Sequence, residues 1–255
     1  MEVHHHPDLE KKGFKEYFLE FIMIFLAVTL GFFAENFREY ISAREKEHAN
    51  INSMVKNLST DSIMVETSIE GVDDVKLKID TLMQLIRSGE YKTEQEMFYR
   101  LAYITRGFRE FEYSNVTFEQ MQSSGSFGLI RNKMIRNDLV NYNNFINTDI
   151  KQLESRVLET ERNQADWQNN ILNDTYYPSV DSIINHHALR THFYRSGDHT
   201  LPGSQDQPAQ FLKLYNLLFE RNVIFNYYRL ELANLKDMNR QLLASIKKEY
   251  RMKNE

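Results

Sequence analysis

Histidines are the residues of this chain best suited to bind a metal ion. His186, His187, His192 and His199 lie close together in the sequence, and three more occupy positions 4–6. Zinc sites on helices usually place two histidines four residues apart. The intervals that end or begin at His192 are five, six and seven residues, so we expect loop and capping roles and no metal site. A metalloenzyme built on His186, His187 or His192 is the alternative, and it requires stoichiometric bound metal.

Glu20 is the one charged residue in the apolar stretch from Tyr17 to Ala34. A carboxylate in such a segment has three roles open to it. It can sit hydrated at the membrane edge, donate a hydrogen bond across a helix pair when protonated, or relay protons or ions. Because Glu20 comes only three residues into the stretch, we favour the first role. The relay role would make the chain an accessory subunit of an ion-driven membrane complex.

Small residues follow Glu20 at helical intervals. Ala27, Gly31 and Ala34 come seven, eleven and fourteen residues after it, so all four share one side of a helix. The pattern Ala27-x-x-x-Gly31 lets two helices approach closely within a membrane. The sequence therefore predicts that this stripe pairs the segment with a second copy or with another membrane protein.

Catalytic motifs are missing from the sequence. There is no glycine-rich phosphate loop, no G-x-S-x-G element and no cysteine, which also rules out disulfides and thiolate zinc sites. The serines and glycine at 123–126 read as a turn between short helices. A net charge of -5 argues against nucleic acid as a partner. We expect no enzymatic activity and no cofactor.

The apolar stretch itself determines the organisation of the chain. Its 18 residues span about 27 Å as a helix, close to the thickness of a bilayer's hydrocarbon core. It is longer than the core of a signal peptide and lacks a following A-x-A site. We therefore expect a His/Lys tail at 1–13, an uncleaved transmembrane helix at 14–37 and a soluble domain at 38–255. Lysines crowd the N-terminal flank while glutamates neutralise the other, which favours a cytoplasmic N-terminus and a periplasmic domain.

Three long segments of the soluble domain carry apolar residues at alternating intervals of three and four. They cover about 42–88, 132–174 and 208–252. This pattern indicates helices with narrow, coiled-coil-like seams, and their similar lengths favour antiparallel packing. No segment reads clearly as a strand. The predicted fold is all-α, with a transmembrane helix followed by an elongated antiparallel helical bundle.

The first seam predicts the core positions of the helix that follows the anchor. The expected residues are Ile51, Val55, Leu58, Ser62, Val65, Ile69, Val72, Lys76, Ile79, Met83 and Ile86. Gly89 should end this helix. Thr160 and Gln164 interrupt the second seam, which should make its middle less tightly specified, and Arg221 and Asn239 interrupt the third.

The connections should form a cap at the far end of the bundle. A short helix at 93–106 and a compact element at 115–131 join the first two long helices, and 176–207 joins the last two. Aromatic residues of both connections should pack there or form a partner surface: Phe108, Phe111, Tyr113, Phe118, Phe127, Tyr176, Tyr177, Phe193 and Tyr194. The chain would then return to the lipid surface, where its basic end complements the helix dipole or contacts headgroups: Lys247, Lys248, Arg251 and Lys253.

Phe14–Asn36 reads FKEYFLEFIMIFLAVTLGFFAEN, and Gln120–Leu139 reads QMQSSGSFGLIRNKMIRNDL. Both segments resemble those of an uncharacterised family of single-span membrane proteins from Gram-negative bacteria. The family is defined by a domain of unknown function, so the resemblance implies membrane anchoring and supplies no catalytic or ligand residue. It also implies that Gly125, Leu129, Ile130 and Asn132 shape a tight helical corner.

These observations predict a membrane-anchored structural or interaction protein of the inner membrane, acting as a scaffold or accessory. Its partners would be membrane lipid and either a second copy or another membrane protein, reached through the span and the bundle. Two alternatives stay open. One is a sensory input domain, and the other is the ion-driven accessory subunit that uses Glu20.

Overall fold

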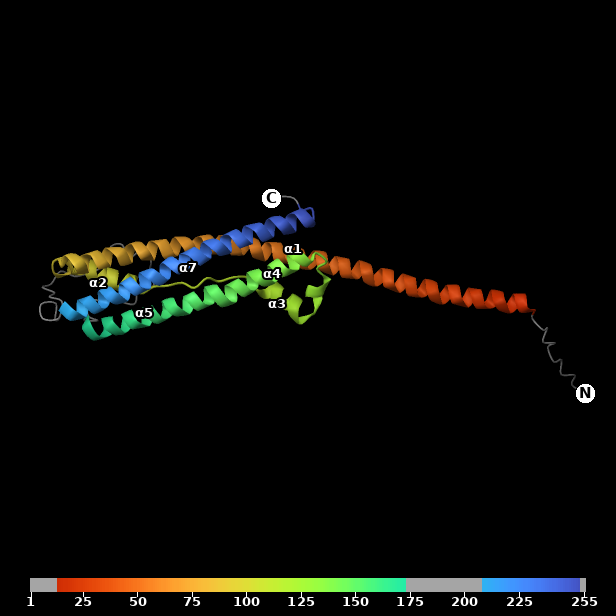
Figure 1. Ribbon diagram of the computed structural model, residues 1–255, viewed down its shortest axis with the longest axis horizontal. Coiled ribbons are helices and arrows are strands. Elements are labelled where there is room, and N and C mark those ends of the chain that lie inside the picture. The colour runs from red at the N-terminus through yellow and green to blue at the C-terminus, as the bar shows by residue number, and fades with distance from the viewer. Residues whose placement is uncertain (1–12, 173–207, 253–255) are drawn as a thin grey trace, which may run out of the picture.

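A computed structural model describes residues 13–172 and 208–252 of the chain, and within these two ranges it contains helices and no β-strand (Figure 1). The prediction of an all-α fold, with a long apolar N-terminal helix followed by a helical bundle, is confirmed. The long elements are α1 (Phe14–Ser88), α4 (Lys133–Phe145), α5 (Lys151–Ile171) and α7 (Pro208–Glu249). The short ones are η1 (Glu90–Lys92), α2 (Gln95–Ile104), α3 (Val116–Ser123), η2 (Ser126–Leu129) and the π-helical turn η3 (Ile146–Ile150).

Helix α1 is a single element of 75 residues, or about 112 Å. The sequence suggested an anchor at 14–37 and a separate helix from about 42, but no proline or glycine lies between Gly31 and Gly71 to interrupt the backbone. The helix ends where predicted, because Gly89 adopts a left-handed conformation with φ 81° and donates its N–H to the Ile86 carbonyl. The apolar segment is thus rigidly continuous with the bundle.

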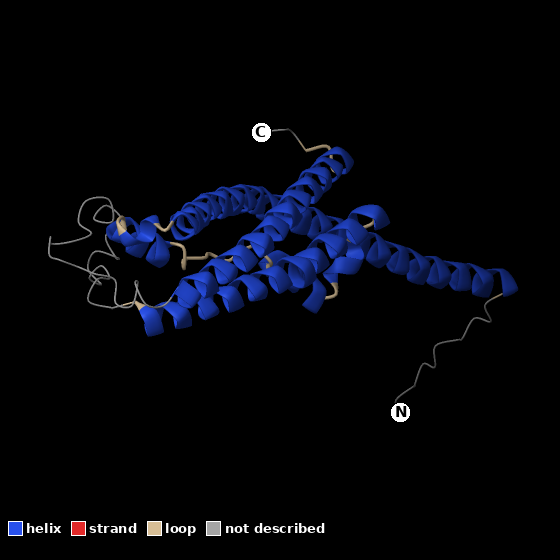
Figure 2. Cartoon of the chain, turned by 60° about the vertical axis from the view of Figure 1, so that its left-hand side comes forward, coloured by secondary structure: helices blue, strands red, loops and turns tan. Residues whose placement is uncertain are grey.

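The N-terminal part of α1 projects beyond all other helices in both views (Figure 1 and Figure 2). We call the end of the bundle next to this projection the proximal end, and the opposite end, near α2, the distal end. The pair α4 and α5 runs from the proximal end to the distal end alongside α1. Helix α7 then returns antiparallel to both, as Figure 1 shows.

The chain reaches the start of α4 by an unexpected route. After α2, residues 107–115 run without helical structure back along the bundle towards the proximal end (Figure 1). Helix α3 and η2 consequently lie beside α1 near the proximal end of the bundle. There Asn57 Nδ2 donates to Thr117 Oγ1 at 2.8 Å and Asn50 Nδ2 donates to Ser126 Oγ at 3.2 Å. The prediction that 115–131 belongs to the distal cap is therefore wrong.

Buried polar side chains hold this returning segment in place. Glu154 accepts hydrogen bonds from the Phe111 N–H at 2.6 Å and from the Tyr228 hydroxyl at 2.9 Å, while Lys151 Nζ donates to it at 2.7 Å. Asp61 accepts the Ser114 N–H at 2.8 Å. An extended backbone inside a helical bundle needs such partners, because its polar groups have none within the segment.

The aromatic residues of the returning segment accordingly pack inside the bundle. Phe111 is buried, as is Phe118 of the following helix α3, and the Phe108 ring lies 5.5 Å from that of Tyr228. They form no distal surface. At the distal end itself, the rings of Tyr91, Phe98 and Trp167 surround Phe211, with centroid distances of 4.2, 5.8 and 5.8 Å.

The seam of α7 is confirmed along its whole length. Its buried residues repeat at intervals of three and four: Phe211, Leu214, Leu218, Arg221, Phe225, Tyr228, Leu232, Leu235, Asn239, Leu242 and Ile246. In α1 five of the eleven predicted seam positions are buried: Ile51, Leu58, Val65, Val72 and Ile79. Four more are half-buried and pack against the core: Val55, Ile69, Met83 and Ile86. Met54, Asp61 and Leu82, which were not predicted, are buried beside this seam.

Asp61 is a buried polar residue of α1, and its carboxylate has hydrogen-bond partners on other segments of the fold. Its carboxylate accepts the Ser114 N–H and the Tyr142 hydroxyl at 3.2 Å, and Asn239 Nδ2 donates to that hydroxyl at 3.1 Å. Burial raises the pKa of Asp61 to about 6, and the two hydrogen bonds only partly offset this effect. Periodicity alone does not identify a buried carboxylate with distant partners.

Gln164, which interrupts the second seam, is hydrogen-bonded to Arg221, which interrupts the third. Arg221 is fully buried; its Nη1 donates to Gln164 Oε1 at 2.8 Å and its Nη2 to the Arg106 carbonyl at 3.0 Å. Gln164 Nε2 donates to Thr105 Oγ1 at 2.9 Å. Burial lowers the pKa of Arg221 to about 10. The middle of the second seam is therefore specified by hydrogen bonds, contrary to the looser packing expected there.

Candidate functional site

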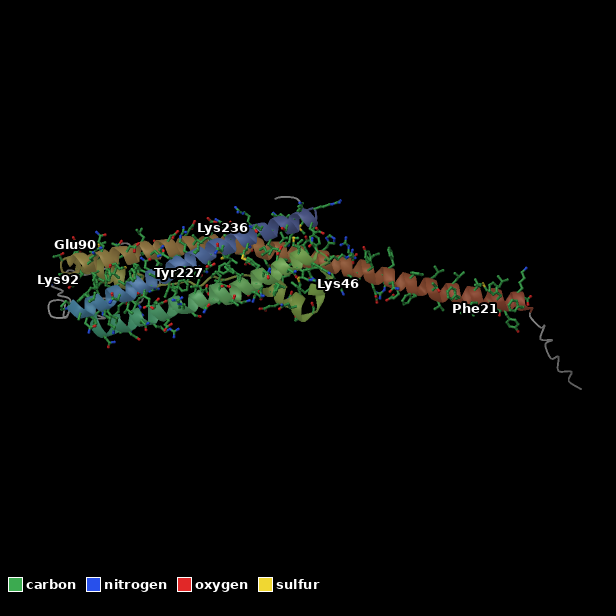
Figure 3. The ribbon with its side chains drawn as sticks, in the orientation of Figure 1. Phe21, Lys46, Glu90, Lys92, Tyr227 and Lys236 are labelled. Atoms are coloured by element: carbon green, nitrogen blue, oxygen red, sulfur yellow. The ribbon has the colours of Figure 1, made fainter. Side chains whose placement is uncertain are left out.

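The N-terminal part of α1 carries large apolar side chains that nothing in the described chain covers. Its most apolar window has a mean hydropathy of 2.1 and no buried residue, and by length and composition the helix is able to cross a membrane. Phe21 marks this region in Figure 3. Glu20, Ala27, Gly31 and Ala34 lie along one side of it. The predicted pairing stripe meets no second helix within the described residues, so the pairing remains a prediction.

Glu47 is the centre of a polar cluster at the proximal end. Its side chain is only 2% exposed. Oε1 accepts the backbone N–H of Arg131 at 3.0 Å and the hydroxyl of Tyr250 at 2.7 Å, while Arg44 Nη1 donates to Oε2 at 3.2 Å. These partners come from α1, from the corner before α4 and from the last turn of α7. One carboxylate therefore joins three segments.

Electrostatics at Glu47 differ from those at Asp61. Burial raises the pKa of Glu47, but the hydrogen bonds from Arg131, Tyr250 and Arg44, together with the charge of Arg44, outweigh it and leave the pKa lowered. Glu47 is therefore ionised at neutral pH. Its charge is matched by Arg44 on the neighbouring turn.

A groove of about 500 Å³ opens at this cluster. It is lined by Arg44, Glu47, His48, Arg131, Glu249, Tyr250 and Arg251. The guanidinium of Arg131 lies 4.7 Å over the ring of Tyr40 and donates to the Tyr40 hydroxyl at 3.2 Å. The ring of His48 meets that of Tyr250 edge-on at 5.4 Å. Three arginines from three segments thus converge on one concave surface, which we call the proximal groove.

The corner before α4, at the residues where the resemblance implied a tight turn, positions Arg131. Gly125 turns the chain with φ 70°, and η2 ends at Leu129. Ile130 is buried, and the side chain of Asn132 caps α4 by accepting the N–H groups of Met134 and Ile135. The corner is therefore a defined structure that presents the backbone N–H of residue 131 to Glu47.

The last turn of α7 supplies the other side of the groove. Lys247, Lys248 and Arg251 lie at the proximal end, because Tyr250 between them bonds to Glu47; their contact with lipid stays a prediction. Arg251 has φ 51°, a left-handed conformation that ends the helix. Lys253, the cap at 176–207 and the histidines His186, His187 and His192 lie outside the described residues.

Positive charge gathers at the proximal end although the whole chain carries -5. Segments 35–48, 131–138 and 247–252 hold nine Lys and Arg residues against six Asp and Glu residues. Lys46 is labelled in this region in Figure 3. Residues 13–172 and 208–252 contain no group of three or more His, Asp or Glu residues arranged to hold a metal ion. The described segments at this end therefore carry more positive than negative charge.

Glu47, Arg131 and Tyr250 are functional candidates that sequence reasoning missed. A signal for Glu47 was present, because it precedes Ile51 by four residues and continues the seam of α1 towards the anchor. Its partners lie 84 and 203 positions away along the chain. No local pattern connects residues at such separations.

The chain matches no protein-family model, no curated protein and no solved structure. The resemblance of 14–36 and 120–139 to a bacterial membrane family therefore stays a prediction, and function has to be argued from the geometry.

Proposed function

We propose that this chain is a membrane-anchored scaffold, a structural and interaction protein without enzymatic activity of its own. Its single span would lie in a bacterial inner membrane, with the N-terminus in the cytoplasm and the bundle in the periplasm. The observation that carries the proposal is α1, which runs without a break from exposed apolar surface into the core of the bundle.

Energetics support a lipid environment for the first part of α1. Large apolar side chains at positions such as Phe21, Phe25 and Leu30 are more than half exposed. Moving each one out of water is worth about 1.5–3 kcal/mol. Because many such residues share this segment, its burial in a bilayer would outweigh the cost of holding a long helix in a fixed orientation.

Continuity of α1 supports the scaffold role. Residues 47–88 extend about 60 Å from the proximal end, and this part packs along much of α7. Ion pairs such as Arg229–Asp73 and hydrogen bonds such as Asn222–Asp80, each at 2.6 Å, line the contact. A bundle of this kind would hold its distal end at a defined height above the membrane.

An exposed apolar stripe on α7 supports the interaction role. It consists of Leu212, Phe219, Val223, Tyr227 and Leu230, which are between 37% and 59% exposed. At about 100° per residue these five positions share one side of the helix, opposite the buried seam. Tyr227 is labelled in Figure 3. Isolated exposed apolar residues are ordinary, but a stripe of five is typical of a contact surface.

We assign this stripe to a second copy of the chain. Two anchored copies stand in one membrane with parallel bundles, so their stripes lie at the same height and a high effective concentration favours contact. The stripe offers roughly 400–500 Å² per copy, which places a symmetric pair near the lower limit of stable interfaces. Close pairing at Gly31 in the span would add to it.

Disulfide cross-linking in native membranes tests this assignment, because the chain has no cysteine of its own. Val223→Cys should form a disulfide-linked dimer on oxidation. Arg162→Cys, at an exposed position on α5, is the matched control and should stay monomeric. Equal cross-linking of both variants, or none at Val223→Cys together with a monomeric mass in mild detergent, would contradict self-association through α7.

The two alternatives, a sensory input domain and an ion-driven subunit that uses Glu20, remain predictions from the sequence. Replacing Glu20 with Gln tests the role of that carboxylate in the second of these. If Glu20 relays protons or ions, the variant should assemble normally but lose function. If Glu20 forms a hydrogen bond between spans, the variant should fail to assemble.

A further inference from the structure

We propose that the proximal groove binds the phosphate group of an anionic membrane lipid. The site consists of Arg44, Arg131 and Arg251, held around the buried carboxylate of Glu47. The inference rests on the proposed membrane anchoring and extends it by naming the chemical class of lipid that the bundle would select.

The arginines of the proximal groove supply the hydrogen-bond donors that a phosphate group requires. A guanidinium is planar and has five N–H groups, which suits bidentate contact with phosphate oxygens. Arg44 contacts Glu47 and Arg131 contacts Tyr40, in each case through Nη1, and Arg131 Nε also lies 4.0 Å from Glu47 Oε2. Each guanidinium keeps further N–H groups for a ligand in the groove that both residues line. Arg251 is exposed and also lines the groove.

Arg44 and Arg131 are also fixed in position, which distinguishes this groove from a solvated basic tail. Arg131 is stacked on Tyr40, and its backbone is tied to Glu47. Arg44 is tied to the same carboxylate, as is Tyr250, the residue before Arg251. Pre-organised donors lose less conformational entropy when a ligand binds.

Two carboxylates line the groove and have to be weighed against this proposal. Glu47 is buried, and its charge is already matched by Arg44 and by two further hydrogen bonds. It acts as a positioning residue for the arginines. Glu249 is exposed, so solvent screens its repulsion. Three arginines against two carboxylates leave the groove net positive, within the wider basic surface of the proximal end.

Position along α1 favours a lipid headgroup over soluble phosphate. Arg44 comes ten residues after Ala34, or about 15 Å along the helix. The interval is not purely polar, since Phe37, Tyr40 and Ile41 expose apolar surface within it. Tyrosine is enriched where a span meets the headgroups. Counted from Ile41, Arg44 is three residues or about 5 Å further along the helix, so Arg44 and Arg131 would stand within reach of the headgroups.

Lipid retention by the full chain tests the proposal. The protein is extracted in mild detergent, mixed with equal parts of phosphatidylglycerol and phosphatidylcholine, and examined by native mass spectrometry. We expect the wild type to retain phosphatidylglycerol preferentially. Arg131→Gln combined with Arg251→Gln should lower this preference by about fivefold per arginine. Arg156→Gln combined with Arg162→Gln removes the same charge from exposed positions on α5 and should leave the preference unchanged.

Three further measurements make each outcome decisive. Circular dichroism checks folding, and Arg251→Gln alone, at an exposed helix end, serves if the double variant unfolds. An unchanged preference in the groove variant, or an equal loss in the α5 control, overturns the site. Displacement of the lipid by millimolar inorganic phosphate overturns the lipid source. Flotation with phosphatidylcholine vesicles reports anchoring separately, so a chain that floats but shows no preference refutes only the groove.

Discussion

Helix α1 contains two regions that share one backbone and differ in everything around it. Residues 14–41 expose nearly every large apolar side chain, whereas 47–88 bury one face against α7 and point charged residues outwards. Helical geometry is the same in both, so side chains alone decide the surroundings that each region requires. The comparison teaches that the first region needs an apolar medium from outside the chain, while the second obtains one from the rest of the fold.

Introducing arginine into each region should produce the largest difference, and the property that differs is membrane association. Leu26→Arg combined with Leu30→Arg should raise the free energy of membrane insertion by about 5–7 kcal/mol, at about 2.5–3.5 kcal/mol for each residue. The chain should then appear in the soluble fraction after carbonate extraction. Leu77→Arg is the control, because Leu77 is as exposed as these residues but lies in the second region. Loss of membrane association by Leu77→Arg would break the comparison.

Replacing one phenylalanine in or against each region should sharpen the comparison, because here the larger effect is expected at the second region. Phe225 of α7 is fully buried against the second region, and its replacement by Ala should lower the free energy of unfolding by about 3–5 kcal/mol. Phe25→Ala in the first region should change the unfolding of the bundle by less than about 0.5 kcal/mol. Urea denaturation in mild detergent, followed by circular dichroism, measures both. Similar losses in the two variants would show that the apolar segment packs on the bundle.

Asp61 is a carboxylate that the second region tolerates, and it should make stability depend on pH. Its pKa of about 6 in the folded chain exceeds the ordinary value of 3.8, so the folded state binds the proton more tightly. The contribution of Asp61 to the free energy of unfolding is therefore present at low pH. It falls by roughly 3 kcal/mol as pH rises from about 4 to 6.

Asp61→Asn imitates the protonated carboxyl, and its amide keeps an acceptor for Ser114. The variant should be more stable than the wild type at pH 7 and about equally stable at pH 4. Free energies of unfolding from urea titrations across this pH range measure the effect. A wild-type advantage at pH 7 would contradict the assigned pKa.

Glu47 lies where the second region begins, and its pH dependence should have the opposite sign. Because its folded pKa is lowered, its stabilising effect is present above the unfolded pKa and is lost as pH falls through the folded value. Glu47→Gln should cost about 1 kcal/mol at pH 7. The difference from wild type should shrink in acid, as thermal unfolding at pH 7 and pH 3 would show. A difference that grows in acid would contradict this account.

Sequence reasoning succeeded where a structure depends on neighbouring residues. The stop at Gly89, the seam of α7 and the apolar character of the first region all follow from local spacing and residue type. It failed at the returning segment 107–115, whose Phe111 and Ser114 bond to carboxylates 43 and 53 positions away. Such partners are chosen by the tertiary fold, and periodicity carries no information about them.

The candidate site was predicted only in part for the same reason. A basic end at Lys247, Lys248 and Arg251 is visible in the sequence, but its position beside Arg44 and Arg131 depends on Glu47. The sequence was read as a span at 14–37 and a bundle helix from about 42, and α1 joins the two because a change of composition does not interrupt a backbone. Only a residue such as Gly89, in a left-handed conformation, does so here.

Accessibility of single cysteines at Ile24 and Leu77 tests the central claim most directly. The two side chains are 66% and 68% exposed in the isolated chain, so the protein alone does not distinguish them. In native membranes, a water-soluble maleimide should label Leu77→Cys rapidly and leave Ile24→Cys unlabelled until detergent dissolves the bilayer. Equal labelling of both cysteines in intact membranes would contradict a lipid-embedded first region and the scaffold built on it.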